Sequence, residues 1–278
     1  VVPVTILTGF LGVGKTTLLK RILTQAHGLR ITAIVNDLSS LAFDADQIAG
    51  AADNTLALNN GCACCSLIGD LQETLQAQLE PANATLPDAI VIELSGVTDA
   101  VGVAQLVDSL LFVRLDGVVT VVDTLNATEQ LGSELAQTLL SQLDAAHLIV
   151  LSKTELADED VTIQLTEQLA IIAPGRPIIR TSSNIDHDVL LGCAQRGARL
   201  PAPRRSHCVD FCTRVVSTDG RFSHRQLERI LAALPTGIVR IKGWCRFSDA
   251  SVAEVQMVGR RWTMTDVTGL RHRETALT

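Results

Sequence analysis

Near its start the chain reads Gly9-Phe10-Leu11-Gly12-Val13-Gly14-Lys15-Thr16-Thr17, between an apolar run over 2–7 and a helical pattern over 17–25. This is the G-x-x-x-x-G-K-T spacing of a phosphate-binding P-loop, in the strand–loop–helix context that the motif requires. The backbone N–H groups of such a turn and the helix N-terminus together surround an anion. Lys15 is predicted to reach the β- and γ-phosphates of a nucleoside triphosphate, and the Thr16 hydroxyl to ligate Mg²⁺.

Composition narrows the class of protein further. The chain has 278 residues, which suffice for a large core and two domains. Hydrophobic residues make up 47% and aromatic residues only 3%, so the core is expected to be aliphatic, as in a buried parallel sheet. The net charge of −7 argues against nucleic acid as a partner.

Hydropathy bears on the cellular location. No stretch is long and apolar enough to span a bilayer, so no membrane partner is expected. The opening residues run directly into the P-loop strand and do not resemble a signal peptide. We therefore expect a cytoplasmic protein, in which the seven cysteines are reduced and serve metal binding or packing rather than disulfides.

Short β-branched runs alternate with helical patterns through the first two-thirds of the chain. Polar residues follow each run, as expected for parallel strands with a ligand site at their carboxyl edge. The runs cover 31–35, 89–92, 117–122 and 147–151, and helical patterns cover 67–79 and 129–143. The predicted fold class is α/β: a P-loop NTPase with a mostly parallel sheet covered by helices.

A change of pattern predicts a second domain. Glycine, proline and arginine gather near 192–205, which indicates a boundary. We assign 1–195 to the P-loop GTPase domain, 196–205 to a linker and 206–278 to a small C-terminal α+β domain. The latter should hold strands near 209–215, 237–241, 252–258 and 261–264 and a helix over 223–234 capped by Ser223.

The second motif is a cluster of cysteines, Gly61-Cys62-Ala63-Cys64-Cys65. Thiolates suit Zn²⁺ and Cu(I), and three of them leave one position open for another ligand or for handing the ion on. By itself the cluster is equally consistent with cysteines packed beside a turn. His207, Cys208 and Cys212 leave a second metal site open, although buried cysteines are the simpler interpretation.

Together the motifs resemble the CobW-like family of P-loop GTPases, a metallochaperone group. The resemblance spans nearly the whole chain. It rests on the P-loop, on the G-C-x-C-C segment 61–65, on Glu93-Leu94-Ser95-Gly96 as an E-x-S-G Walker B element, on the strand 116–123 and on Ser152-Lys153-Thr154-Glu155 at the guanine-reading position. The segment 227–243 is similar to part of the family's small C-terminal domain.

The resemblance implies roles for individual residues. Gly12, Val13, Gly14, Lys15, Thr16 and Thr17 would hold phosphates and Mg²⁺, and Glu93 would hold Mg²⁺ through water or position the attacking water. Cys62, Cys64 and Cys65 would bind the transported Zn²⁺ or Co²⁺. Lys153, Glu155 and Ser182 would line the pocket for the base of GTP.

Two segments depart from the family pattern. The switch segment reads Asn36-Asp37-Leu38-Ser39-Ser40 in place of Asn-Glu-Phe-Gly-Glu, so one carboxylate is shortened and another is lost. Ser152-Lys153-Thr154-Glu155 replaces Asn-Lys-x-Asp, and the longer Glu155 is expected to weaken the preference for guanine over adenine.

The function predicted on these grounds is a Mg²⁺-dependent GTPase that delivers a transition metal to a client metalloenzyme or apoprotein. If GTP tightens metal binding, metal must tighten GTP binding by the same factor. The alternative is a GTP-switched client-binding or cofactor-loading module whose cysteines are structural. A P-loop kinase is disfavoured by the cysteine cluster, and a homodimer is left open.

Overall fold

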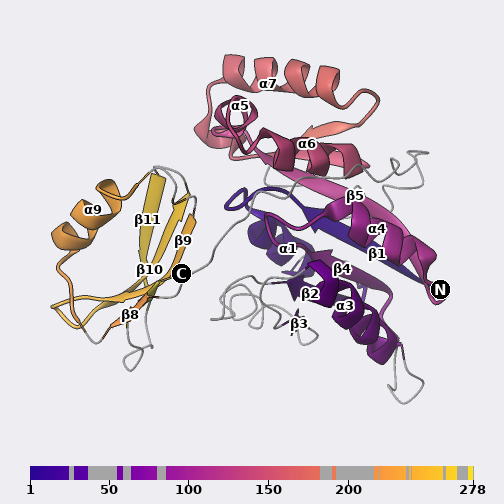
Figure 1. The fold of residues 1–278 in the computed structure, drawn as a ribbon, viewed down its shortest axis with the longest axis horizontal. Helices are drawn as coiled ribbons and strands as arrows, with labels where there is room; N and C mark the ends of the chain where they lie inside the picture. The colour runs from indigo at the N-terminus through magenta and orange to yellow at the C-terminus, as the bar shows by residue number, and fades with distance from the viewer. Residues whose placement is uncertain are drawn as a thin grey trace. The chain divides into compact units, whose positions relative to one another are not determined.

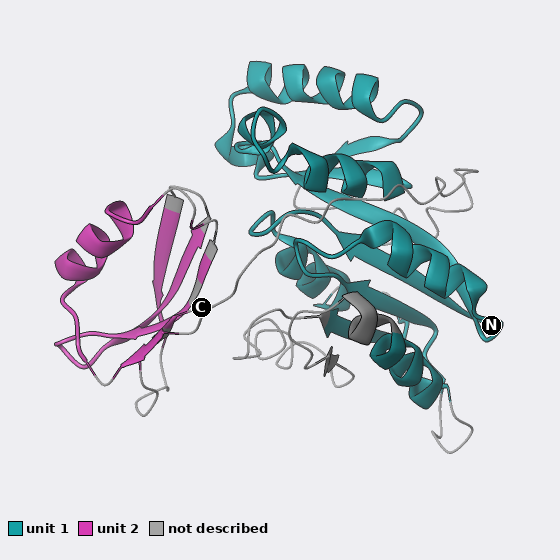
Figure 2. Ribbon diagram, in the orientation of Figure 1, with its two compact units in different colours: residues 1–38, 44–210 teal, residues 39–43, 211–278 magenta. Residues whose placement is uncertain are grey.

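The computed structural model describes residues 1–24, 28–36, 55–58, 64–79, 86–181, 190–191, 216–218, 220–235, 238, 240–258, 261–267 and 275–277. Two compact units emerge, one from Val1–Leu38 with Asp44–Asp210 and the other from Ser39–Phe43 with Phe211–Thr278 (Figure 2). The predicted linker 196–205 lies outside the described residues, so the placement of that boundary stays a prediction.

The first unit is built on a seven-stranded sheet in which every pairing is parallel (Figure 1). Its strand order is β3-β2-β4-β1-β5-β6-β7. The strands are β1 (Val2–Thr8), β2 (Ile31–Asn36), β3 (Thr55–Leu58), β4 (Ala89–Glu93), β5 (Val113–Asp123), β6 (Leu148–Ser152) and β7 (Ile178–Arg180).

Helices connect these strands, as parallel pairing requires. They are α1 (Lys15–Thr24), α3 (Cys64–Gln78), α4 (Ala100–Ser109), α5 (Ala127–Leu131), α6 (Ala136–Ala145) and α7 (Glu159–Ile172), with a single 3₁₀ turn η1 (Thr154–Leu156) after β6. The predicted α/β class with a parallel sheet is therefore confirmed. None of the described helices combines the length and apolarity needed to cross a bilayer.

The core forms where the central strands meet helices. Val4, Ile6, Ile90 and Ile92 are fully buried in the middle of the sheet. They share one apolar cluster with side chains of α3 and α4, namely Leu71, Leu75, Val103, Ala104 and Val107. The β-branched runs in the sequence are thus strands whose side chains are buried, which explains their lack of polar alternation.

One predicted helix is wrong in its extent. The pattern over 129–143 is split into α5 and α6. Gly132 caps α5 by donating its N–H to the carbonyls of Thr128 and Glu129, at 3.2 and 3.1 Å. The Ser133 hydroxyl then accepts from the N–H of Leu135 at 3.2 Å, a local bond that competes with the helical ladder.

The second unit is a five-stranded sheet with one helix. Its strand order is β11-β10-β9-β12-β8, and each pairing is antiparallel. The elements are β8 (Val216–Thr218), α9 (His224–Ala232), β9 (Arg240–Arg246), β10 (Val252–Val258), β11 (Arg261–Asp266) and β12 (Thr275–Leu277). β9 begins later and runs further than the predicted strand 237–241, whereas the predicted strand 209–215 lies outside the described residues.

The predicted cap of the second unit's helix is confirmed. The Ser223 hydroxyl accepts from the N–H of Gln226 at 3.2 Å, and the Gln226 side chain accepts from the N–H of Ser223 at 2.8 Å. This reciprocal capping box fixes the start of α9. Leu227 and Leu231 then belong to the unit's own apolar cluster with Cys245 and Phe247.

An ion pair joins two strands of the large sheet just before they begin. Arg30, before β2, donates its backbone N–H and its guanidinium to the Asp88 carboxylate before β4, over 2.8, 3.1 and 3.0 Å. Hydrogen bonds from the guanidinium, followed by the bond from the backbone N–H, lower the pKa of Asp88 to about 2. The pair lies at the edge opposite the carboxyl ends of the strands.

This lowered pKa predicts a specific pH dependence of stability. Because the folded-state pKa lies below the ordinary value of about 3.9, the stabilisation is complete above about pH 5 and is lost as the pH falls toward 2. The free energy of unfolding by urea, compared between wild type and Asp88→Asn, should differ most at pH 7, narrow to about half of that gap near pH 3 and converge only below about pH 2. Asp108→Asn, an exposed carboxylate on α4, serves as the control, and a gap that does not narrow would contradict the assignment.

Candidate nucleotide-binding site

The P-loop connects β1 to α1 in the conformation that its glycines allow. Gly9, Gly12 and Gly14 have φ values of 136°, 73° and 96°, a region that other residues rarely adopt. A side chain at Gly9 would also collide with the carbonyl oxygen of Val121 in β5. The first glycine is therefore required both for the turn and for the close packing of the loop on the sheet.

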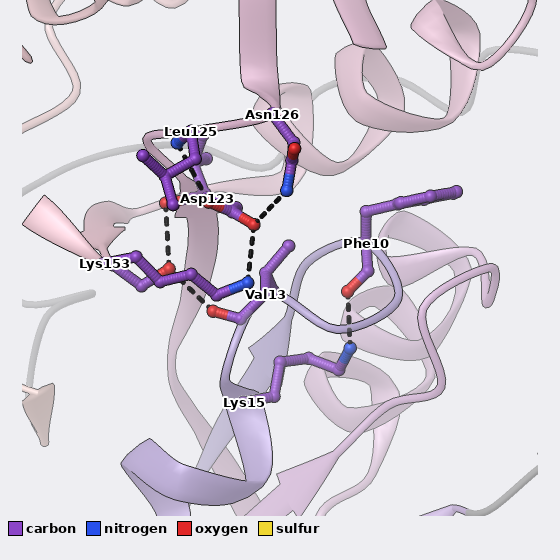
Figure 3. A network of polar contacts seen from close by, with 9 residues as sticks. Phe10, Val13, Lys15, Asp123, Leu125, Asn126 and Lys153 are labelled. Atoms are coloured by element: carbon purple, nitrogen blue, oxygen red, sulfur yellow. Dashed lines mark hydrogen bonds and ion pairs between the residues drawn. The ribbon is translucent and has the colours of Figure 1, made fainter. Parts of the chain in front are cut away.

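Lys15 is the first residue of α1, directly after this loop. It is only 6% exposed, and its Nζ donates to the carbonyl oxygen of Gly9 at 2.8 Å. The same Nζ donates to the carbonyl oxygen of Phe10 at 2.9 Å (Figure 3). The ammonium is thus held by the loop's own backbone. Thr16 and Thr17 follow in the first turn of α1, with Thr17 exposed.

Thr16 and Glu93 meet across the sheet edge. The Thr16 hydroxyl donates to Glu93 Oε1 at 2.8 Å, and Glu93 is 3% exposed at the end of β4. The parallel register sets Glu93 opposite Leu7, immediately before the P-loop. A hydroxyl beside a carboxylate is a set of hard oxygen donors, which suits Mg²⁺.

Gly96 and Gln142 form a contact that the sequence did not indicate. A side chain at Gly96 would overlap the backbone nitrogen of Leu11 in the P-loop, so the Walker B turn packs directly on that loop. Gln142, buried in α6, donates its amide to the Gly96 carbonyl oxygen at 2.9 Å. A glutamine within a helical pattern gives no signal of such a role.

The end of β6 is attached to the P-loop. The Ser152 hydroxyl donates to the carbonyl oxygen of Val13 at 2.7 Å. The next residue, Lys153, has a left-handed φ of 59° and directs its Nζ to Asp123 Oδ2 at 2.7 Å (Figure 3). Ser152, which departs from the family pattern, thus links the end of β6 directly to the P-loop.

The other residues predicted for the base pocket and the metal site are described only in part. Glu155 lies in the 3₁₀ turn η1 with an exposed side chain. Cys64 and Cys65 are the first residues of α3, and only their backbone is described. Cys62, Ser182, His207, Cys208, Cys212 and the segment 37–40 lie outside the described residues. Within the described part of the chain, no group of three or more His, Cys, Asp or Glu side chains is arranged to hold a metal ion.

This fold and this loop define a P-loop nucleotide-binding protein. Residues 3–180 match the model of the CobW/HypB/UreG nucleotide-binding domain, and residues 211–275 match that of the cobalamin synthesis protein CobW C-terminal domain. The chain belongs to the CobW/HypB/UreG family, a family of P-loop GTPases, and the predicted resemblance is confirmed.

Two curated relatives and one solved structure illustrate the similarity. The zinc chaperone YjiA of Escherichia coli K12 is 38% identical over 198 residues, which cover 68% of this chain and 60% of YjiA. The zinc chaperone CobW of Sinorhizobium sp is 31% identical over 237 residues, which cover 74% of this chain and 66% of the relative. The matched part of the chain thus spans less than two thirds of the length of either relative.

The solved structure supports the fold alone. The crystal structure of Zn(II)-bound YjiA GTPase from E. coli aligns with a TM-score of 0.50 at 24% identity, over 99% of this chain and 93% of that chain.

The Ser152–Val13 bond predicts a loss of nucleotide affinity when it is removed. Ser152→Ala leaves the Val13 carbonyl without this donor and detaches the end of β6 from the P-loop. We expect the dissociation constant for Mg²⁺-GDP, measured by calorimetry, to rise about tenfold, equivalent to about 1.4 kcal/mol. Ser152→Asn, which restores an amide donor, should recover part of the affinity, and an unchanged constant in Ser152→Ala would contradict the role of this bond.

Proposed function

We propose that this chain is a Mg²⁺-dependent GTPase that carries Zn²⁺ and delivers it to a client apoprotein when GTP is hydrolysed. The observation that carries the proposal is the Thr16–Glu93 contact beside Lys15 at the end of β1. It combines the three groups that phosphoryl transfer needs in one place: a cation for the phosphates, a hydroxyl for the metal and a buried carboxylate.

Each of these side chains has a distinct part in hydrolysis. Lys15 would exchange its two carbonyl acceptors for β- and γ-phosphate oxygens when nucleotide binds, and would stabilise the charge that develops during transfer. Glu93, through its acceptor position beside Thr16, would orient a water molecule. Gly12, Val13, Gly14 and Thr17 would complete the phosphate loop.

Thr16 and Glu93 would hold Mg²⁺, whose contribution when bound is to neutralise phosphate charge. The donor set fits this ion because both groups offer oxygen and neither offers sulfur or imidazole. The chain's own residues then restrict the nucleotide to one orientation. Catalysis by positioning of this kind predicts slow intrinsic turnover.

The zinc ion is the cargo, and Cys62, Cys64 and Cys65 are the proposed ligands. Support comes from the cysteine cluster itself and from the two relatives YjiA and CobW, which are zinc chaperones. Cys64 and Cys65 open α3, whose Leu71 and Leu75 pack in the same cluster as Ile92 next to Glu93. That connection offers a route by which nucleotide state would alter the metal site.

The proposed coupling is tested by metal affinity in different nucleotide states. Chelator competition with Zn²⁺ and Co²⁺, run with Mg²⁺-GTP and with Mg²⁺-GDP, should give tighter binding with GTP, by about 5- to 150-fold for a typical coupling. The variant Cys62→Ala/Cys64→Ala should lose one equivalent of bound metal. Cys245→Ala, a buried cysteine of the second unit, is the matched control.

Two outcomes would contradict the metal-carrier proposal. Equal metal affinity with GTP and GDP would uncouple the cysteines from the nucleotide. An unchanged metal stoichiometry in the double variant would remove them as ligands. Either result would favour the alternative in which the chain is a GTP-switched client-binding module.

Base selection is proposed to depend on Lys153, Glu155 and Ser182. Glu155 keeps the carboxylate that guanine recognition needs, but its side chain is one methylene longer than aspartate. Glu155→Asp should therefore raise the ratio of ATP to GTP dissociation constants, by about tenfold if one further hydrogen bond to the base is gained. Glu159→Asp, an exposed carboxylate on α7, is the control, and an unchanged ratio would exclude Glu155 from base reading.

A further inference from the structure

Asp123 at the end of β5 binds three partners in two loops. Its Oδ1 accepts the backbone N–H of Leu125 at 2.9 Å. Its Oδ2 accepts the Asn126 amide at 2.6 Å and the Lys153 ammonium at 2.7 Å (Figure 3). The sequence predicts Asp123 as the end of a strand but does not indicate a functional role for it.

The environment of this carboxylate differs from that of a surface ion pair. The side chain of Asp123 is 4% exposed and that of Lys153 is 28% exposed. Solvent screens such a pair less than it screens an exposed pair. The two hydrogen bonds from Leu125 and Asn126 also fix the carboxylate before the lysine reaches it, so the acceptor is held in place in advance.

The backbone of Lys153 is also constrained. Its left-handed φ of 59° sets the direction of the side chain, and Ser152 on its N-terminal side is bonded to the P-loop. The ammonium at one end and the backbone at the other are then both fixed. Between them the aliphatic stem has little freedom to leave the edge of the sheet where the nucleotide base is proposed to bind.

We propose that Asp123 is a positioning residue for nucleotide binding, which holds Lys153 so that the lysine stem lies against the face of the base. This inference rests on the proposed nucleotide site and deepens it. It separates two tasks: Asp123 and Lys153 support the plane of any base, whereas Glu155 reads its edge. Stacking on a plane does not distinguish guanine from adenine, but a phosphate chain without a base has nothing to stack.

The experiment compares three ligands by calorimetry: Mg²⁺-GTP, Mg²⁺-ATP and inorganic triphosphate with Mg²⁺. In Asp123→Asn the dissociation constants for GTP and ATP should rise by the same factor, between about tenfold and a hundredfold. The constant for inorganic triphosphate should stay at the wild-type value. A merely structural loss would weaken all three ligands together.

A second variant tests the same Asp123–Lys153 ion pair by changing the lysine. Lys153→Met keeps the aliphatic stem but removes the ammonium, and it should show the same ligand pattern even if Asp123→Asn fails to fold. The Asp123→Asn/Lys153→Met double variant should bind GTP no more weakly than the single variant with the lower affinity, because both substitutions remove the same interaction. Asp116→Asn is the matched control because Asp116 is another buried carboxylate of β5, paired with Arg114 at 3.1 Å.

The outcomes separate this inference from the proposed function. If the wild-type chain binds GTP and both Asp123→Asn and Lys153→Met bind it with the same dissociation constant, the positioning role is overturned and the nucleotide site stands. Additive losses in the double variant, or an equal loss for inorganic triphosphate, would overturn it as well. Failure of the wild-type chain to bind GTP, ATP or triphosphate would overturn the proposed function and this inference with it.

Discussion

The site depends on the parallel pairing of β1 with β4 on one side and β5 on the other. That pairing places Leu7 opposite Glu93, and it carries β5 to its end at Asp123 on the same edge as the P-loop. Residues separated by tens of positions in the chain therefore meet within hydrogen-bond distance. The apolar interior of the sheet sets this alignment, because a shift in register would displace Glu93 from Thr16 and would also disturb the packing of Ile90 and Ile92.

The same alignment explains why the contacts between loops are short and direct. The P-loop touches the turn after β4 through Leu11 and Gly96, and it touches the end of β6 through Val13 and Ser152. Gln142 in α6 holds the carbonyl of Gly96, and Asp123 at the end of β5 holds the ammonium of Lys153. The described part of the site is thus a set of loops braced against one another by backbone atoms as well as side chains.

Much of this fold could be predicted from the sequence because its signals are local. A β-branched run that ends in a polar residue marks a buried parallel strand, and the P-loop spacing marks Lys15 and Thr16. The break at Gly132 could not be predicted from periodicity, since the apolar pattern continues on both sides of it. Gln142 was missed for another reason: its partner, the Gly96 carbonyl, lies 46 positions away and is brought to it only when the sheet has formed.

The bond between Ser152 and Val13 joins residues 139 positions apart. Through it, the P-loop is tied directly to the end of β6. For a ligand that contacts both segments, such a connection would fix the distance between its two points of attachment, and would thereby select the length of the ligand as well as its chemistry.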